Sequence, residues 1–377
     1  MTQWRLGLAW LLAVIAIPAA ALAAELKDEV EQIVSREIRP TLPADGATGV
    51  AMAVRINGQT LFFNYGCADF ASRRPVNSDA LFNLASIDKV FDATLLAQAI
   101  QQGEIGFDDP VAQFVTELQQ GGDIRQVTIG QLATHTSGLL LPQDHPPWSE
   151  EHYTLPEFLS TLNAWKADAA HEPGKQHIYT HAGFILLHLA IERRFGSSLA
   201  QLMEERVLRP LGLVSTSIPM STGDPRGSLD PELRTRAVQG YAEDGTPIGE
   251  PGDVQGYYLW PGTAQMFSSA RDMAVLIAAN LGELPRQAAL QDAMRFAQQG
   301  VITIGPRNMQ TLAWELLRDG KQTIAEKQGG LNNNSIYIGM IKRAKLGIVI
   351  LWNRGDQEAV AVGRRILREL ARQELPK

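Results

Sequence analysis

The beginning of the chain has the pattern of a helix followed by a β-hairpin. Apolar side chains recur at helical spacing over residues 26–38, and the two apolar segments 50–56 and 60–65 flank Asn57-Gly58. An Asn-Gly pair favours a two-residue hairpin turn, because both turn residues must adopt positive φ. We therefore predict a helix and two antiparallel strands in this part of the chain.

The end of the chain has the same elements in the opposite order. Two apolar segments, 335–341 and 346–353, flank a short polar turn and precede a helical stretch over 358–374. The middle, roughly residues 86–281, consists mostly of helical runs separated by loops rich in glycine and proline. These patterns predict an α/β fold with one antiparallel sheet built from both termini and flanked by helices, plus a mostly helical lobe. A cleft is expected between the two parts.

The same patterns divide the chain into segments. We assign residues 25–84 and 295–377 to a discontinuous α/β sheet domain and residues 85–294 to the helical lobe. The two parts together are expected to form one catalytic unit, because a cleft between them is the usual place for a site.

Residues 1–23 have the features of a signal peptide. Arg5 supplies a positive end, residues 6–17 form an apolar run, and residues 21–23 (Ala-Leu-Ala) match a small-residue cleavage site. The apolar run is too short for a membrane span, so no stable membrane insertion is expected after cleavage. An exported chain with a single cysteine, Cys67, fits a bacterial periplasm, where unpaired thiols are drawn into disulfides.

Composition narrows the classes of function. The 377 residues are 45% hydrophobic and 20% charged, which excludes a disordered or fibrous protein. The formal net charge is −7 and lysine and arginine form no block, so nucleic acid is not an expected partner. One cysteine can form neither an internal disulfide nor a cysteine-rich zinc site. We expect a monomer that acts on a small molecule.

The sharpest local signal is Ser86-Ile87-Asp88-Lys89, at the start of a predicted helix that ends at Gly103. Residues three apart share a helix face, so the amine of Lys89 can reach the hydroxyl of Ser86. A lysine that acts as a base must be neutral, and burial with the positive end of the helix would lower its pKa toward that state. The alternative is an N-capping serine followed by a solvated lysine.

A series of further motifs runs through the chain in a fixed order. Its segments are 81–89, 103–111, 127–138, 172–174, 179–181, 210–213, 268–274, 314–316, 327–329 and 346–351. In this order they resemble the serine β-lactamase and penicillin-binding-protein superfamily, and within it class C β-lactamases with their esterase and DD-peptidase relatives. The series covers nearly the whole mature chain. An ordered series of this length is more specific than any one of its motifs.

The resemblance implies a β-lactamase/transpeptidase-like fold and an acyl-enzyme mechanism that requires no cofactor. Ser86 would attack the carbonyl of a β-lactam or another acyl compound. Lys89 and Tyr179, the first residue of the family's Tyr-x-Asn element, would share the proton transfers, and Lys327 of the Lys-Thr-Gly element would orient the substrate carboxylate. The backbone N–H groups of Ser86 and Gly330 would form the oxyanion hole, where such donors contribute about 3 to 4 kcal/mol each.

Two positions of the predicted substrate-binding set depart from the family pattern. His181 stands in place of the asparagine of Tyr-x-Asn, and Gln328 stands in place of the threonine of Lys-Thr-Gly; Gly329 and Gly330 complete the set. The family amide donates to the acylamide carbonyl of the substrate, so its loss predicts a substrate profile shifted toward carbapenems, whose small side chains need no such donor. The class C carboxylate-binding loop has no recognisable counterpart after residues 353–355.

Histidines gather between residues 145 and 188. His177 and His181 have the i,i+4 spacing that places two imidazoles on one helix face, so a zinc site on this pair is an alternative. Residues 173–174 (Pro-Gly) argue against a regular helix there, and the sequence holds no His-Glu-x-x-His motif. We expect no metal and interpret these as surface or hydrogen-bonded histidines, and His135 as a residue that braces a loop.

The predicted function is a periplasmic serine β-lactamase, a hydrolase of antibiotic resistance that opens the β-lactam amide through an acyl-enzyme on Ser86. Two alternatives stay open. A penicillin-binding esterase or D-amino-acid peptidase would share every catalytic residue and differ in deacylation and pocket shape. A non-catalytic binder of β-lactams or peptidoglycan is suggested by the altered positions His181 and Gln328.

Overall fold

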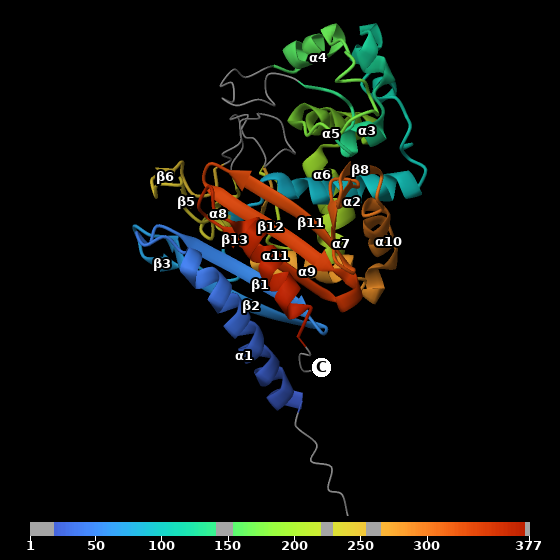
Figure 1. Ribbon diagram of the computed structural model, residues 1–377. Helices are drawn as coiled ribbons and strands as arrows, with labels where there is room; N and C mark the ends of the chain where they lie inside the picture. The colour runs from blue at the N-terminus through green and yellow to red at the C-terminus, as the bar shows by residue number, and fades with distance from the viewer. Residues whose placement is uncertain (1–18, 141–153, 220–228, 254–264, 374–377) are drawn as a thin grey trace, which may run out of the picture.

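The computed structural model describes residues 19–140, 154–219, 229–253 and 265–373. Its strands are β1 (Gly49–Ile56), β2 (Gln59–Asp69), β3 (Arg74–Pro75), β4 (Phe82–Asn83), β5 (Gly240–Tyr241), β6 (Pro247–Ile248), β7 (Phe267–Ser268), β8 (Ile302–Gly305), β9 (Asn308–Gln310), β10 (Glu315–Asp319), β11 (Gln322–Leu331), β12 (Asn334–Ile341) and β13 (Leu346–Trp352). Nine of them form one sheet in the order β3-β2-β1-β13-β12-β11-β10-β9-β8 (Figure 1). The pairs β4–β7 and β5–β6 form two small separate sheets.

The two ends of the chain meet in the middle of this sheet. β1 pairs antiparallel with β13, so that Val54 lies opposite Ile348. The predicted turn closes the β1–β2 hairpin, with Asn57 at φ 49° and Gly58 at φ 75°. The prediction of an antiparallel sheet built from both termini is confirmed, and the turn chemistry explains why the first hairpin could be read from the sequence.

The α-helices are α1 (Ala19–Ile38), α2 (Asp88–Gln101), α3 (Ile129–Ala133), α4 (Leu155–Ala164), α5 (His181–Phe195), α6 (Leu199–Met203), α7 (Arg209–Leu211), α8 (Pro231–Arg234), α9 (Ala270–Asn280), α10 (Ala288–Ala297) and α11 (Ala359–Leu370). Short 3₁₀ turns are η1 (Arg39–Thr41), η2 (Ala85–Ile87), η3 (Val111–Gln113), η4 (Thr116–Gln120), η5 (Asp123–Gln126), η8 (Pro285–Gln287) and η9 (Lys342–Ala344), and η7 (Glu204–Leu208) is a π turn.

Helices α1 and α11 cover one face of the sheet and contact each other, although they come from opposite ends of the chain (Figure 1). Val34 and Ile366 are buried there with Met52 and Ile350 of the sheet. Helix α1 starts before the predicted position and includes the predicted cleavage segment 21–23, whereas residues 1–18 of the predicted signal peptide lie outside the described residues. Within the described residues, no helix combines the length and apolar character of a membrane span.

The opposite face of the sheet packs on α9. Helices α3, α4 and α5 of the helical lobe lie above the sheet in the view of Figure 1. Alternate residues of a strand point to opposite faces, so Met52 joins the core under α1 while its neighbour Ala53 joins the core of the lobe. With both faces covered, the central strand β13 is apolar along its whole length. The assignment of residues 85–294 to a separate domain stays a prediction; its end at residue 294 falls inside α10.

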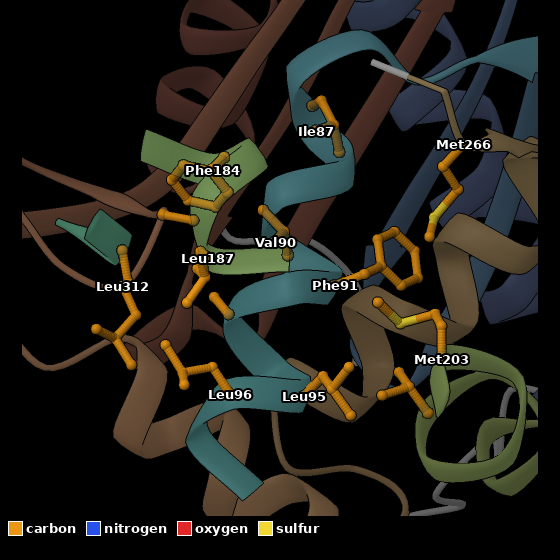
Figure 2. Close-up of a cluster of buried hydrophobic side chains, with 14 of the residues drawn as sticks. Ile87, Val90, Phe91, Leu95, Leu96, Phe184, Leu187, Met203, Met266 and Leu312 are labelled. Carbon is orange, nitrogen blue, oxygen red and sulfur yellow. The ribbon is translucent and has the colours of Figure 1, made fainter. Parts of the chain in front are cut away.

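Helix α2 crosses the centre of the lobe and is buried on nearly every side. Figure 2 shows Phe91 and Leu95 directed toward Met203, and Leu96 on the side of Leu187. α10 also packs against α2. Because most of α2 is buried, the polar side chains of Asp88, Lys89, Asp92 and Thr94 must find their partners inside the protein.

The packing of α2 predicts a large cost for Phe91→Ala. Phe91 is fully buried, so the truncation removes apolar contact and leaves a cavity that the tightly packed lobe cannot close. We expect a loss of about 3–5 kcal/mol in the free energy of unfolding, measured by urea denaturation. The matched control is Phe70→Ala, because Phe70 is 47% exposed; its effect should stay within about 0.5 kcal/mol. Equal losses in the two variants would contradict this account of the core.

Candidate active site

Ser86 lies in the turn η2, directly ahead of α2 rather than inside the helix. The preceding residue, Ala85, has φ 48°, a left-handed conformation that costs energy for any residue with a Cβ atom. The Ala85 N–H donates to Asn83 Oδ1 at 2.8 Å, and Asn334 Nδ2 donates to the Asn83 carbonyl at 3.0 Å. These bonds from β4 and β12 hold the strained turn that presents the Ser86 hydroxyl.

A cavity of about 840 Å³ opens in front of Ser86. It lies between the start of α5, strand β11 and the segments that follow β5 and β13. Lys89 is fully buried and lies outside the lining, at the inner side of Ser86. The predicted site residues that line the cavity are Ser86, Tyr179, His181, Lys327, Gln328, Gly329 and Gly330.

Two predicted partners reach the Ser86 hydroxyl. The Tyr179 hydroxyl donates to Ser86 Oγ at 2.8 Å, and Lys89 Nζ donates to the same oxygen at 3.4 Å. Lys89 Nζ lies 5.8 Å and Lys327 Nζ 5.0 Å from the centre of the Tyr179 ring. Burial raises the pKa of Tyr179, but the two lysine cations outweigh it and bring this pKa below its usual value. The phenol is therefore easier to deprotonate than an ordinary tyrosine.

The charge of Lys89 differs from the sequence-based expectation. Burial lowers the pKa of Lys89, but the oxygen of Tyr179 and the carboxylates of Asp88 and Asp92 raise it by more, so the net shift is upward. Asp88 Oδ1 lies 3.8 Å from Lys89 Nζ. The expectation of a neutral lysine was wrong, because it counted burial and the helix end but not the two carboxylates buried with the amine. Lys89 is a cation at neutral pH.

Strand β11 brings the second lysine to the cavity. Lys327 is only 2% exposed, and its Nζ lies 3.8 Å from Glu315 Oε1. β11 pairs with β12 as far as Leu331, but its register with β10 ends at Glu326. Beyond Glu326, one edge of β11 therefore faces the cavity, and its backbone groups are available to a bound molecule.

Gly329 allows β11 to approach the Ser86 turn. A Cβ atom at this position would lie 2.6 Å from the Leu84 carbonyl oxygen, far inside van der Waals contact. Its neighbours Gln328 and Gly330 are exposed on the same strand. The glycine thus sets the short distance between β11 and the nucleophile, which is the distance that an oxyanion site built from both elements requires.

His135 contributes more to the site than the predicted bracing of a loop. Its ring stacks on Tyr179 with 4.2 Å between ring centres. His135 Nδ1 accepts from the Thr180 N–H at 3.3 Å, and the Ile178 N–H donates to the His135 carbonyl at 2.7 Å. Burial, with the cations of Lys327 and Lys89, holds the pKa of His135 well below its usual value. A neutral imidazole therefore fixes Tyr179; nothing in the spacing of the two residues signals this contact.

The two candidate metal ligands do not share a helix face. α5 begins at His181, so His177 lies ahead of the helix, where its Nε2 donates to Gln310 Oε1 at 3.1 Å. His181 instead lies edge-on to Tyr179, with 5.3 Å between ring centres. Among the described residues, no group of three or more histidine, cysteine, aspartate or glutamate side chains is arranged to hold a metal ion.

This geometry agrees with comparisons to known proteins. The β-lactamase family model matches residues 28–373. The chain belongs to the β-lactamase family. A β-lactamase of Pseudomonas fluorescens is 27% identical over 369 residues, which cover 89% of this chain and 96% of the relative.

Solved structures narrow the family to one class of fold. A class C β-lactamase has a TM-score of 0.77 with 25% identity, covering 91% of this chain and 97% of its own. A D-alanine carboxypeptidase from Burkholderia cenocepacia has a TM-score of 0.78 with 24% identity, covering 91% and 99%. The predicted membership of the serine β-lactamase superfamily, the class C-like fold and the class of enzyme, a serine hydrolase, are confirmed.

The neutral state of His135 predicts a pH dependence of stability. In the unfolded chain this histidine is protonated below about pH 6.5, whereas in the folded protein it stays neutral to lower pH. The contribution of His135 to the free energy of unfolding is therefore lost as the pH falls. In His135→Phe this loss is absent. Urea denaturation at pH 7.5 and pH 5.5 should therefore show a smaller acid-induced loss in the variant, with a difference of up to about 1.4 kcal/mol per pH unit. An equal loss in both proteins would mean that His135 is protonated in the fold.

Proposed function

We propose that this enzyme hydrolyses β-lactams through an acyl-enzyme on Ser86. The observation that supports the proposal most directly is the 2.8 Å contact between the Tyr179 hydroxyl and Ser86 Oγ, with the Nζ atoms of Lys89 and Lys327 5.8 Å and 5.0 Å from the centre of the Tyr179 ring. A serine hydroxyl is a weak nucleophile until a neighbouring base removes its proton. The two cations make the Tyr179 oxygen the base that the geometry favours.

In the first half of the reaction, deprotonated Tyr179 accepts the proton of Ser86 while Ser86 Oγ attacks the β-lactam carbonyl carbon. The carbonyl oxygen becomes an oxyanion, for which the N–H groups of Ser86 and Gly330 are the proposed donors. Collapse breaks the carbon–nitrogen bond, and the proton on Tyr179 passes to the leaving nitrogen. Lys89 stays a cation throughout and stabilises the negative oxygen of Tyr179.

In the second half, water hydrolyses the ester on Ser86, while the amine released from the opened ring stays attached to the acyl group. Tyr179 removes a proton from the water as its oxygen attacks the ester carbonyl, and the proton then returns to Ser86 Oγ as the ester bond breaks. Lys327 and the exposed amide of Gln328 are proposed to bind the substrate carboxylate. Lys327 already has a partner in Glu315, so the substrate carboxylate competes with a protein carboxylate for this cation.

The finer parts of the proposal concern place and substrate. The segment 1–23 supports action in the periplasm. There the enzyme is proposed to act as a monomer, without a cofactor, and to confer antibiotic resistance. His181 lines the cavity in place of the family's asparagine, which supports a profile shifted toward carbapenems. A D-amino-acid peptidase or esterase is the second candidate, because one of the similar structures is a D-alanine carboxypeptidase.

Ser86→Ala tests the nucleophile. We expect it to lower hydrolysis of a chromogenic cephalosporin at least about 10⁴-fold and to abolish any covalent adduct, because no other oxygen replaces the nucleophile. The measurements are turnover and intact mass after incubation. Ser72→Ala, at an exposed turn serine, is the matched control and should keep full turnover. Full activity of Ser86→Ala would refute the assignment.

The wild-type result separates the candidate functions. Turnover supports the β-lactamase, a stable adduct without turnover supports the penicillin-binding peptidase or a binder, and neither result supports an esterase with other substrates. These outcomes are read from the same two measurements.

His181→Asn tests the proposed substrate profile. The variant restores the family's donor, so kcat/KM for cephalosporins with an acylamino side chain should rise about tenfold, the value of one good hydrogen bond. Carbapenem hydrolysis should change less than about threefold, because no donor is gained for their small side chains. A cephalosporin rate that does not rise would remove His181 as the cause of any carbapenem preference.

The same proteins test the zinc alternative at His177 and His181. Metal analysis and turnover with and without chelator suffice. Stoichiometric zinc with a chelator-reversible loss of activity, abolished by His181→Asn, would replace the metal-free proposal.

A further inference from the structure

Four ionisable side chains form a buried cluster beneath the nucleophile. Asp88, Lys89 and Asp92 of α2 are 2%, 0% and 1% exposed, and His188 of α5 is 3% exposed. Only Lys89 belongs to the site predicted from the sequence. The other three side chains have no role in the reaction as described so far.

The cluster is connected by short contacts. Asp88 Oδ1 lies 3.8 Å from Lys89 Nζ, and Asp92 Oδ2 lies 2.9 Å from His188 Nε2. The Phe184 ring bridges the two pairs: Lys89 Nζ lies 5.3 Å from its centre, and its centre is 6.1 Å from that of the His188 ring. The negative charge of Asp92 also acts on Lys89, one helical turn away. The cluster therefore spans from α2 to α5 without contact with solvent.

Such a cluster is expensive if its role is only to join two helices. Each buried ion loses several kcal/mol of hydration, and apolar residues of similar volume replace buried ion pairs at no net loss in many proteins. The adjoining part of α2 already packs with apolar side chains against the lobe (Figure 2). Lys89, one helical turn from Asp92, needs a buried negative charge nearby. The amine of Lys89 stabilises Tyr179 and Ser86 only while this amine is protonated.

We propose that Asp92 and His188 are positioning residues of the hydrolytic reaction, which hold Lys89 as a cation and fix α2 against the middle of α5. This inference rests on the proposed function. The Asp92 carboxylate supplies negative charge behind the amine. His188 Nε2 lies 2.9 Å from that carboxylate and links it to α5, the helix that begins two residues after Tyr179.

Lys89 has neighbours on several elements, and His135 is among the groups that its charge affects, because the cation lowers the pKa of that histidine. From α2 the neighbours are Asp88 and Asp92; from η2, Ser86; and from α5 and the segment before it, Phe184 and Tyr179. Lys327 Nζ of β11 lies 5.0 Å from the centre of the Tyr179 ring, and the charge of His188 lowers the pKa of Asp88. Burial raises the pKa of Asp88 to about 6, so above neutral pH Asp88 is ionised and the alkaline side of the rate profile reports on Lys89 and Tyr179.

The first variant neutralises the proposed charge. In Asp92→Asn the amine of Lys89 loses a nearby anion, so it deprotonates at lower pH. We expect kcat for the chromogenic cephalosporin to fall about tenfold or more, KM to change less than about threefold, and the alkaline limb of the kcat–pH profile to move down by about one pH unit. Asp92→Glu keeps the charge and should keep the position of the limb.

The second variant separates charge from packing. The double variant Asp92→Leu/His188→Leu replaces the ion pair with apolar side chains and should fold with a melting temperature near that of the wild type. If the pair acts through its charge, this stable protein still shows the low kcat and the displaced alkaline limb. Recovery of wild-type kcat and pH profile in the double variant would overturn the proposal. This test can be made even if Asp92→Asn does not fold.

Asp272→Asn is the matched control. Asp272 is 3% exposed on α9, accepts from the Ser215 N–H at 2.7 Å, and is not among the residues that line the cavity. Its variant should lose stability but keep the alkaline limb. A limb that moves equally in the Asp272 and Asp92 variants would overturn the proposal.

The activity of the wild type separates a failure of the proposed function from a failure of the role proposed for Asp92 and His188. If it shows neither turnover nor an adduct on Ser86, the proposed function fails. If it turns over and the Asp92 variants keep its kcat and pH profile, only the role of Asp92 and His188 fails.

Discussion

The buried cation of Lys89 is the constraint on which the arrangement of this protein depends. A charge without access to water is stable only among compensating groups, so the amine must be surrounded by Asp88 and the oxygens of Ser86 and Tyr179. These groups come from α2, the turn before it and the start of α5. The central place of α2 in the lobe is therefore an electrostatic requirement as well as a packing one.

The same constraint explains why different side chains set the charge and the orientation of the Tyr179 phenol. Lys89 is enclosed and Lys327 lines the cavity, yet both lower the pKa of Tyr179 against the effect of burial. His135 stacks on the ring but stays neutral, so it orients Tyr179 without adding a third positive charge. Position and charge are thus supplied by different side chains.

The sequence predicts those parts of the fold and site that local chemistry determines. The Asn57-Gly58 turn and the last strand pair follow from short patterns, and the ordered motifs lead to Ser86, Lys89, Tyr179 and Lys327. The short strands β8 to β10 were not predicted, because segments of three to five residues show too little periodicity and are defined by pairing with β11.

The contacts of His135 and His188 could not be predicted for a different reason. They join segments that are far apart in the chain, where spacing holds no information about distance. The same limit applies to the charge of Lys89. The acids at positions 88 and 92 are visible in the sequence, but only the fold shows that both are buried with the amine.

The pairing of β1 with β13 has a consequence for how the molecule is made. The Gly49 N–H donates to Asn353 Oδ1 at 2.6 Å across 304 positions of sequence, so the middle of the sheet closes only when the last strand is present. Until then β1 exposes a long apolar edge, which is an open template for another chain. Contacts of such long range form slowly, because the conformational entropy of the intervening chain is lost before the strand pairing stabilises the structure. A chain interrupted before β13 therefore lacks the centre of its sheet rather than an edge, and it is a substrate for aggregation and proteolysis instead of a smaller working enzyme.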